Sequence, residues 1–312
     1  MRTTLRNNFI KKHHLEEYFL TSLKHDASLR RYFRLTLGKK TLILMDCPPE
    51  YESLIPFINV TKFLAKNNFS VPEIYHHDLT NGFLILEDFG DNIINDYLNN
   101  YPIHTEKIYF LIIDNLIQLA KISKLPDLPK HDKQTLISGI TVFQTFYLES
   151  NEPEFLLLCN KLFNKLDYKY NHICLRDFHI DNLIYLTDRK SFNKIGLLDY
   201  QDASLGFLCY DLLSLLQDAR RYISPSLQEK YLKYFLDNIS DIDQHKFFEE
   251  YEILSFQRNA RIIGLFNKFY KKNNNSSYLK YLDNVFKYFK TNLQSKHLKD
   301  IKLYLSNYQT TP

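Results

Sequence analysis

The sequence is poor in several residues that mark particular protein classes. Its 312 residues include no tryptophan, two methionines, seven glycines and four cysteines. The cysteines have no paired spacing, which argues against a disulfide framework, and we predict reduced, mostly buried thiols at Cys47, Cys159, Cys174 and Cys209. The remaining composition, 45% hydrophobic and 24% charged, is ordinary for a globular protein and allows one large or two modest domains.

Long apolar runs and dense basic clusters are also missing. The amino-terminal region has no apolar core of signal-peptide length, and no stretch approaches the roughly 18 apolar residues of a membrane span. We therefore expect a cytoplasmic protein with no membrane partner. The net charge is only +4, and the lysines of residues 268–290 alternate with Tyr, Phe and Leu at helical spacing. This pattern is typical of a solvated helix face, so no nucleic-acid partner is expected.

Four polar residues in the second half of the chain carry the functional prediction. Asp177 and Asn182 lie in CLRDFHIDNLIYL, and Asp199 and Asp211 lie in IGLLDYQDASLGFLCYDLLSLL. Each follows or interrupts an apolar run that is typical of a buried strand. Transfer of the γ-phosphoryl group of ATP requires an Asp that orients the acceptor hydroxyl, and an Asn and an Asp that hold Mg²⁺. Any single Asp is more typical of a cap or a turn, so the prediction depends on the whole set.

Each of these four residues has a predicted role. Mg²⁺ prefers oxygen ligands and keeps some waters, so the amide of Asn182 and the carboxylate of Asp199 suffice when phosphate oxygens complete the shell. Asp177 lies five positions before Asn182 and is predicted to orient the acceptor. Asp211 begins an apolar helical segment, and we interpret it as a support that either caps this helix or accepts backbone N–H groups of the catalytic loop.

These motifs resemble a known superfamily. The sequence LRD at residues 175–177 with Asn182, followed by LDYQD at residues 198–202, is similar to the aminoglycoside phosphotransferase and choline kinase superfamily. The resemblance implies the α+β, protein-kinase-like fold, with a small N-lobe built on an antiparallel sheet and a larger, mostly helical C-lobe. It also implies ATP and Mg²⁺ as cofactors. One departure is Leu175, where the superfamily often has a histidine.

Four further segments are similar to one group within this superfamily. Residues 28–35, 44–50, 214–222 and 257–266 resemble the bacterial kinases that phosphorylate the anomeric hydroxyl of N-acetylmuramate and N-acetylglucosamine. The predicted function is therefore phosphorylation of a small-molecule sugar hydroxyl. Two alternatives stay open: a choline or aminoglycoside kinase, since the abundant tyrosines would suit a cationic substrate, and a pseudokinase that serves as a binding module.

Local patterns predict the order of elements in the first part of the chain. The patterns indicate a helix over residues 9–23, a hairpin with strands 29–37 and 41–46, a helix over residues 51–65, and a second hairpin with strands 73–78 and 83–88. Gly38 and Gly82 are expected in the two turns. Beyond Tyr210 the pattern is helical to the end of the chain.

These elements place the N-lobe at residues 1–89, a hinge at residues 86–90 and the C-lobe at residues 90–312. In the kinase fold, adenine contacts backbone groups of the hinge. The resemblance therefore implicates Glu87, Asp88 and Phe89 in nucleotide binding, while their side chains are equally typical of a solvated turn.

The usual kinase devices for holding phosphates are missing. Kinases use a glycine-rich loop and a strand lysine, whereas the segment before the first predicted strand has no glycine and Met45 stands near the expected position of the lysine. The phosphates still need cationic or amide donors. We therefore predict that Ser28 and one or two of Arg30, Arg31 and Arg34 bind them, with Arg31 on the opposite face of the strand. The alternative is an exposed basic strand face.

The remaining candidates concern the acceptor. The segments that resemble the amino-sugar kinases contain five charged residues suited to substrate binding: Asp218, Arg220, Arg221, Arg258 and Arg261. An arginine would suit the lactyl carboxylate of N-acetylmuramate, and surface ion pairs are the alternative. Arg176 would meet the product phosphate or pair with a structural acid, and Asp202 would be a ligand or a local turn residue.

Overall fold

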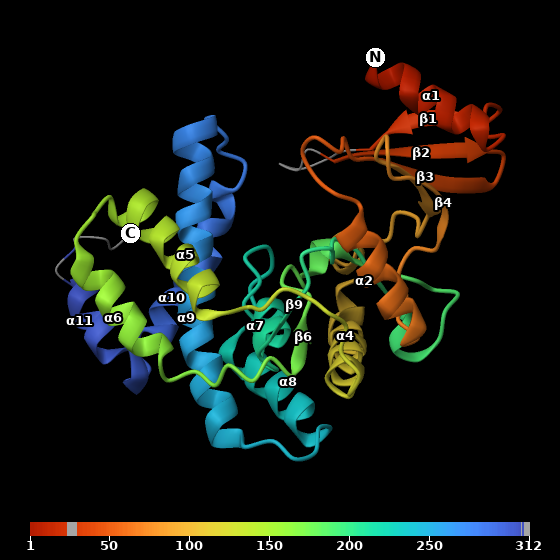
Figure 1. Ribbon diagram of the computed structural model, residues 1–312. Helices are drawn as coiled ribbons and strands as arrows, with labels where there is room; N and C mark the ends of the chain where they lie inside the picture. Colours follow the sequence, from red (N-terminus) through yellow and green to blue (C-terminus); the bar gives the residue numbers. More distant parts are fainter. Residues whose placement is uncertain (24–29, 307, 309–312) are drawn as a thin grey trace. The chain divides into compact units, whose positions relative to one another are not determined.

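The computed structural model describes residues 1–23, 30–306 and 308 of the chain (Figure 1). Ser28, one of the residues predicted to bind phosphate, lies outside the described residues. The chain forms two compact units: unit 1 contains residues 1–102 and 181–202, and unit 2 contains residues 103–180 and 203–312. The hinge at residues 86–90 stays a prediction.

Unit 1 is built on a five-stranded antiparallel sheet with the strand order β1-β2-β3-β5-β4. Its elements are α1 (Arg2–Lys12), β1 (Phe19–Ser22), β2 (Arg31–Leu37), β3 (Lys40–Asp46), α2 (Ile55–Lys66), β4 (Ile74–Asp78), β5 (Phe83–Glu87) and α3 (Ile94–Asn100). Both predicted hairpins are present. At the second turn Gly82 has a φ of 71°, and a Cβ atom there would lie 1.8 Å from the carbonyl oxygen of Cys47, so only glycine fits.

One face of this sheet packs against α1. Side chains alternate between the two faces of a strand, and the residues facing α1 include Phe33, Leu35 and Leu44. They form one buried cluster with Phe9 and Ile10 of α1. Figure 1 shows α1 beside the sheet. The opposite face of β2 carries polar side chains of this strand that are candidates for the active site.

The predicted helix over residues 9–23 is wrong in its extent. The helix ends at Lys12, and His14 follows with a left-handed φ of 57°. Residues 19–22 form β1, which pairs antiparallel with β2. Phe19, an apolar residue within the predicted helix, is 72% exposed. Pairing with the edge of β2 satisfies backbone groups that a local pattern could not assign.

A short hairpin from the second half of the chain completes unit 1. Its strands β7 (Leu183–Tyr185) and β8 (Ile195–Leu197) pair antiparallel, with Leu183 opposite Leu197. Two backbone hydrogen bonds attach the hairpin to the rest of the unit. The N–H of Leu197 donates to the carbonyl of Ser70 at 2.8 Å, and the N–H of Tyr185 donates to the carbonyl of Asn92 at 2.8 Å.

Unit 2 is mostly helical, as the sequence predicts. Its elements are α4 (Thr105–Ala120), α5 (Lys133–Phe143), α6 (Pro153–Phe163), β6 (His172–Cys174), β9 (Ser204–Gly206), α7 (Tyr210–Leu216), α8 (Pro225–Asp237), α9 (Gln244–Asn273), α10 (Leu282–Asn292) and α11 (Lys299–Ser306). The strands β6 and β9 pair antiparallel. The helices α5 and α9 approach closely, because a Cβ atom at Gly264 would lie 2.5 Å from the backbone nitrogen of Phe143.

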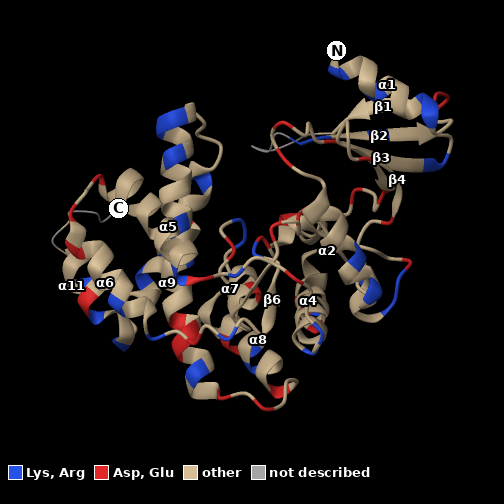
Figure 2. Cartoon of the chain, in the orientation of Figure 1, with Lys and Arg blue, Asp and Glu red and all other residues tan. Residues whose placement is uncertain are grey.

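The general features also agree with the composition. All four cysteines are buried and unpaired. Lys268, Lys271 and Lys272 are exposed near the carboxyl end of α9, where Figure 2 shows basic residues on the helix surface. Across the part of the chain that the structure describes, every helix is too short or too polar to span a membrane.

Candidate active site

The β7–β8 hairpin brings two predicted metal ligands together. Asn182 directly precedes β7, and Asp199 follows β8 after one residue. Antiparallel pairing places these two ends of the hairpin side by side, and the N–H of Leu198 donates to the carbonyl of Asn182 at 2.9 Å. The side-chain amide nitrogen of Asn182 then lies 3.5 Å from Oδ2 of Asp199. An amide and a carboxylate therefore share one small region of unit 1.

The backbone at Asp199 has an uncommon conformation. Its φ is 55°, in the left-handed region that residues other than glycine seldom adopt. The next residue explains how this conformation is held: the Tyr200 hydroxyl lies 2.8 Å from that of Thr61, and its ring stacks on Phe57 at 5.3 Å. Tyr200 is 1% exposed, and burial raises the pKa of its hydroxyl, so it stays a neutral hydrogen-bonding group. Packing against α2 therefore fixes where the Asp199 carboxylate points.

Two further polar groups surround the Asp199 carboxylate. Gln201 donates from Nε2 to Oδ1 of Asp199 at 3.0 Å and to Oδ2 of Asp202 at 3.3 Å. The guanidinium of Arg30 lies 3.4 Å from Oδ1 of Asp199. The Asp199 side chain is nevertheless 44% exposed, which leaves room for another ligand. Asp202, one of the residues with two predicted roles, is thus linked to the site through an amide and is itself exposed.

The three arginines near β2 occupy different surroundings. Arg30 is 8% exposed and forms ion pairs with Glu52 at 3.1 Å and with Asp199. Arg31 is exposed, and alternation along the strand directs it to the face opposite Arg34. Of the three, Arg30 is the one that lies beside the predicted metal ligands.

Arg34 is engaged with the segment that follows β5. Its guanidinium contacts Asp88 at 2.7 Å and Asp91 at 2.8 Å. The Asp88 carboxylate also accepts the N–H of Gly90 at 2.9 Å, and its side chain is 3% exposed. These contacts order the predicted hinge segment from within unit 1.

The residues beside Asp88 are held as well. Glu87 forms an ion pair with Arg189. The Arg189 guanidinium lies 4.9 Å from the ring of Phe89. A Cβ atom at Gly196 would lie 2.8 Å from the Phe89 ring, so β8 has a glycine where this ring packs. The side chains of Glu87 and Asp88 are therefore occupied by protein contacts, which leaves the backbone as the part suited to a nucleotide.

The loop that contains Asp177 lies in unit 2 and is anchored by Asp211. The carboxylate of Asp211 accepts the N–H of Leu175 at 2.6 Å and the N–H of Arg176 at 2.9 Å. Arg176 has a left-handed φ of 71°, and its carbonyl accepts the hydroxyl of Ser214 at 3.3 Å. Burial raises the pKa of Asp211 to about 7, although the two N–H groups favour the charged form. Asp211 therefore has the geometry of a loop support, while the N-cap of α7 is Cys209.

Asp218 is a second anchor of this loop. The sequence instead predicts a role for it in binding the acceptor. Its side chain is fully buried and accepts the N–H of Ile180 at 3.2 Å and that of Arg220 at 2.9 Å. Burial raises its pKa, and the charge of Arg220 opposes that shift. Asp218 lies beyond the carboxyl end of α7, which ends at Leu216, so the seven-residue spacing from Asp211 gave no signal for this shared role.

The other arginines predicted for the acceptor lie near these anchors. Arg220 contacts Asp218 at 3.7 Å, and Arg221 is half-buried. Arg258, on α9, is 5% exposed and donates to the carbonyl of Gln217 at 3.2 Å. Burial lowers the pKa of Arg258, while Tyr210, Asp218 and Asp177 raise it, so Arg258 lies within electrostatic range of Asp177.

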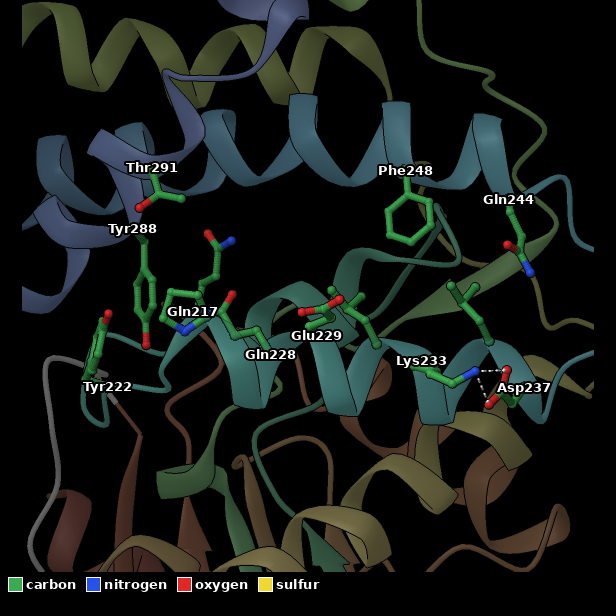
Figure 3. Close-up of a pocket in the computed structure, with 13 residues that line it drawn as sticks. Gln217, Tyr222, Gln228, Glu229, Lys233, Asp237, Gln244, Phe248, Tyr288 and Thr291 are labelled. Carbon is green, nitrogen blue, oxygen red and sulfur yellow. Dashed lines mark hydrogen bonds and ion pairs between the residues drawn. The ribbon is translucent and has the colours of Figure 1, made fainter.

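A cavity of about 480 Å³ lies among α8, α9 and α10 of unit 2 (Figure 3). Tyr222 and Tyr288 stack at 5.4 Å at one end, and the Lys233–Asp237 ion pair lies at the other. None of the residues predicted for catalysis, metal binding or the acceptor lines it. The chemistry of the candidate site is therefore elsewhere.

The fold, the pair Asn182 and Asp199 in unit 1, and the anchored Asp177 loop in unit 2 together define a phosphotransferase with a protein-kinase-like fold. The chain belongs to the phosphotransferase enzyme family, whose model matches residues 20–248. It is 30% identical over 283 residues to the N-acetylmuramate/N-acetylglucosamine kinase of Pseudomonas aeruginosa, an alignment that covers 85% of this chain and 81% of the relative. The resemblance drawn from the motifs is thereby confirmed.

Solved structures show the same fold at low sequence identity. The ADP-bound aminoglycoside phosphotransferase APH(2'')-Ib is 14% identical, with a TM-score of 0.64 over 92% of this chain and 98% of that chain. The choline kinase LicA from Streptococcus pneumoniae is 12% identical, with a TM-score of 0.65 over 92% of this chain and 99% of that chain. These likenesses confirm the predicted fold class.

Proposed function

We propose that this protein is an ATP- and Mg²⁺-dependent kinase that phosphorylates the anomeric hydroxyl of N-acetylmuramate or N-acetylglucosamine. The observation that carries the proposal is the placement of Asn182 and Asp199 at 3.5 Å by one hairpin, next to the cation of Arg30. The acceptor is taken from the Pseudomonas aeruginosa relative, which is named N-acetylmuramate/N-acetylglucosamine kinase. We further propose that the protein is located in the cytoplasm, where ATP is available.

The residues of unit 1 suit a magnesium ion that is shared with phosphates. No group of three or more His, Cys, Asp or Glu side chains gathers as a metal cage in the described ranges. Magnesium does not require one, because it is held in kinases by one carboxylate and one amide oxygen together with phosphate oxygens and water. The half-exposed Asp199 carboxylate and the neighbouring Asn182 amide fit this pattern. When bound, the ion would neutralise charge that develops on the transferred phosphoryl group.

Arg30 is suited to bind the ATP phosphates in place of the strand lysine that this sequence lacks. In protein kinases that lysine contacts the phosphates and pairs with an acid from a nearby helix. Arg30 pairs with Glu52, which lies just before α2, and reaches Asp199 with the other side of its guanidinium. An arginine can bind phosphate through two N–H groups where lysine offers a point charge. Arg34 is bound to Asp88 and Asp91, so we assign it to the hinge segment and assign the phosphates to Arg30.

Asp177 is assigned to orientation of the acceptor hydroxyl. A carboxylate is too weak a base to deprotonate a sugar hydroxyl fully in the ground state, and a loose transition state does not require it to do so. The loop around Asp177 is fixed by buried carboxylates at both ends, Asp211 before it and Asp218 after it. Positional rigidity is the property that an orienting residue needs.

An acceptor panel tests the proposal. Release of ADP is measured with N-acetylmuramate, N-acetylglucosamine, choline and kanamycin at saturating MgATP, with Asp177→Asn as the matched control. We expect turnover with the two amino sugars that is lost in Asp177→Asn. Turnover with choline or kanamycin alone would replace the proposed acceptor, and binding of MgATP without turnover of any acceptor would indicate a pseudokinase.

A further inference from the structure

A second, smaller cavity lies beside the loop that carries Asp177. It has a volume of about 200 Å³ and is enclosed by α5, α9 and the start of α7, all in unit 2. The residues that matter for its chemistry are His131, Thr135, Arg176, Tyr210, Gln257 and Arg261. Arg176 is the residue directly before Asp177, so the cavity adjoins the proposed catalytic loop.

The charge of this cavity is positive and is not balanced by acids. Two arginines, Arg176 from the loop and Arg261 from α9, contribute to its wall, and no Asp or Glu does so among the described residues. Neither arginine has an ion pair with an acid in that part of the chain. The Nε atom of Arg176 is buried and has no hydrogen-bond partner among residues 1–23, 30–306 and 308. Two guanidinium groups that face one small cavity repel each other unless an anion lies between them.

Two deeply buried polar side chains also lack partners here. His131 is 3% exposed, and its Nδ1 atom has no hydrogen bond to any residue that the structure describes. Gln257 is 1% exposed and donates from Nε2 to the carbonyl of Leu136 at 3.0 Å. Its Oε1 atom has no partner within the described ranges of the chain. Burial, together with the charges of Arg176 and Arg261, lowers the pKa of His131 to about 3, so the imidazole is neutral. Buried polar atoms without partners are uncommon, and a polar ligand would satisfy them.

The cavity lies within electrostatic range of Asp177. Burial raises the pKa of the Tyr210 hydroxyl, Arg261, Arg258 and Arg176 lower it, and Asp177 raises it. One hydroxyl in the wall therefore senses both the cavity arginines and the acceptor-orienting carboxylate. The cavity and Asp177 are further linked through the chain, because Arg176 in the cavity wall directly precedes Asp177.

We propose that this cavity binds the carboxylate of the acceptor sugar through Arg176 and Arg261, and so selects N-acetylmuramate over neutral amino sugars. The inference rests on the proposed function. N-acetylmuramate has a lactyl carboxylate that N-acetylglucosamine lacks, and a planar guanidinium binds a carboxylate through two parallel N–H groups. The helix α5 leaves space for this arrangement, because a Cβ atom at Gly139 would lie 3.0 Å from Cδ of Arg261 and 2.6 Å from Nε2 of Gln257.

Steady-state kinetics with both sugars test the assignment. Arg261→Gln is expected to raise KM for N-acetylmuramate by about 10- to 100-fold, the loss typical of one charge-assisted hydrogen-bond pair, and to leave KM for N-acetylglucosamine within about twofold. Lys272→Gln is the matched control, because it removes one positive charge from the exposed end of the same helix. It should change neither constant.

The methyl ester of N-acetylmuramate removes the same interaction from the substrate side. Wild-type protein should bind the ester at least as weakly as Arg261→Gln binds the acid, and the difference in KM between acid and ester should be smaller in the variant, because only Arg176 is left to bind the carboxylate. If Arg261→Gln does not fold, as judged by its thermal transition, Arg261→Lys is used. Arg261→Lys keeps the positive charge but lacks the planar guanidinium with its two parallel N–H groups. It should raise KM for N-acetylmuramate alone.

The two proposals fail in different ways. Equal changes in KM for both sugars, or an acid–ester difference as large in the variant as in the wild-type protein, would overturn the carboxylate assignment while the kinase function stands. Absence of turnover with either sugar in the wild-type protein would overturn the proposed function, and the acceptor subsite with it.

Discussion

Replacement of Asp211 by asparagine isolates the contribution of one buried carboxylate to the loop that carries Asp177. Asp211 accepts two backbone N–H groups, at 2.6 and 2.9 Å, from a position that is 4% exposed. Hydrogen bonds to charged groups contribute about 1.5–3 kcal/mol each, so the two bonds amount to roughly 3–6 kcal/mol. Asparagine keeps one acceptor and turns its amide N–H₂ group toward the second donor, which is then buried without a partner.

Two effects reduce the net loss. The bond that asparagine retains returns about 1 kcal/mol, and the neutral amide avoids the cost of burying a charge. That cost is substantial, because burial raises the pKa of Asp211 to about 7. We therefore expect Asp211→Asn to lower the free energy of unfolding by about 2 kcal/mol, or roughly 4 °C in Tm. A displaced loop should also lower kcat for the sugar by about 10- to 100-fold.

Urea unfolding followed by circular dichroism, and ADP release measured well below Tm, provide the two readouts. Asp237→Asn is the control, since Asp237 forms an exposed ion pair with Lys233 at 3.1 Å and should change stability by less than about 0.5 kcal/mol. An Asp211→Asn variant with the stability and kcat of the wild type would refute the assignment of Asp211 as the loop support. A loss of stability with unchanged kcat would show that the loop does not depend on this anchor.

Three further predictions address titration, phosphate binding and the metal. The pKa of Asp211 is raised in the folded protein from its ordinary value of 3.8 to about 7, so the stability linked to its protonation is present at low pH and is lost as pH rises toward 7. The difference in unfolding free energy between wild type and Asp211→Asn should therefore shrink from pH 5 to pH 8. A difference that stays constant over this range would contradict the raised pKa. Arg30→Gln should raise KM for ATP about tenfold, whereas Arg31→Gln, on the exposed opposite face, should leave it unchanged, and equal effects would remove the phosphate role from Arg30. Asp199→Asn should raise the Mg²⁺ concentration needed for half-maximal activity by about 100-fold in a metal titration, and an unaltered Mg²⁺ dependence would exclude Asp199 as a ligand.

Much of the fold follows from local patterns. Alternating apolar residues and glycine turns indicated both hairpins of the sheet, and the long apolar stripes indicated the helices of unit 2. The first helix was placed wrongly, because the spacing of apolar residues up to Leu23 is also compatible with a strand that pairs at the edge of β2. Strand pairing depends on a partner elsewhere in the chain, which a local pattern does not contain.

The roles of individual charged residues were less accessible. The sequence predicted one or two of Arg30, Arg31 and Arg34 as phosphate ligands, with Arg31 on the opposite face of the strand. Ion-pair partners separate the other two: Asp199 for Arg30, and Asp88 for Arg34. These partners lie far along the chain from β2. Charge alone therefore predicted the kind of group needed, while its position depended on tertiary contacts.

The sequence by itself determined the family, the order Asp177, Asn182, Asp199 and the predicted chemistry, because phosphoryl transfer requires those residue types in short, rigid segments. The tertiary structure decided which side chains meet. It brought Asp218 into hydrogen-bond contact with the loop after Asp177, and Arg30 into contact with Asp199. It also placed Arg176 and Arg261 in the wall of one cavity, although 85 positions separate these two residues in the sequence. Such neighbours are set by the packing of helices and strands, since burial and charge pairing are properties of contacts that only the folded chain contains.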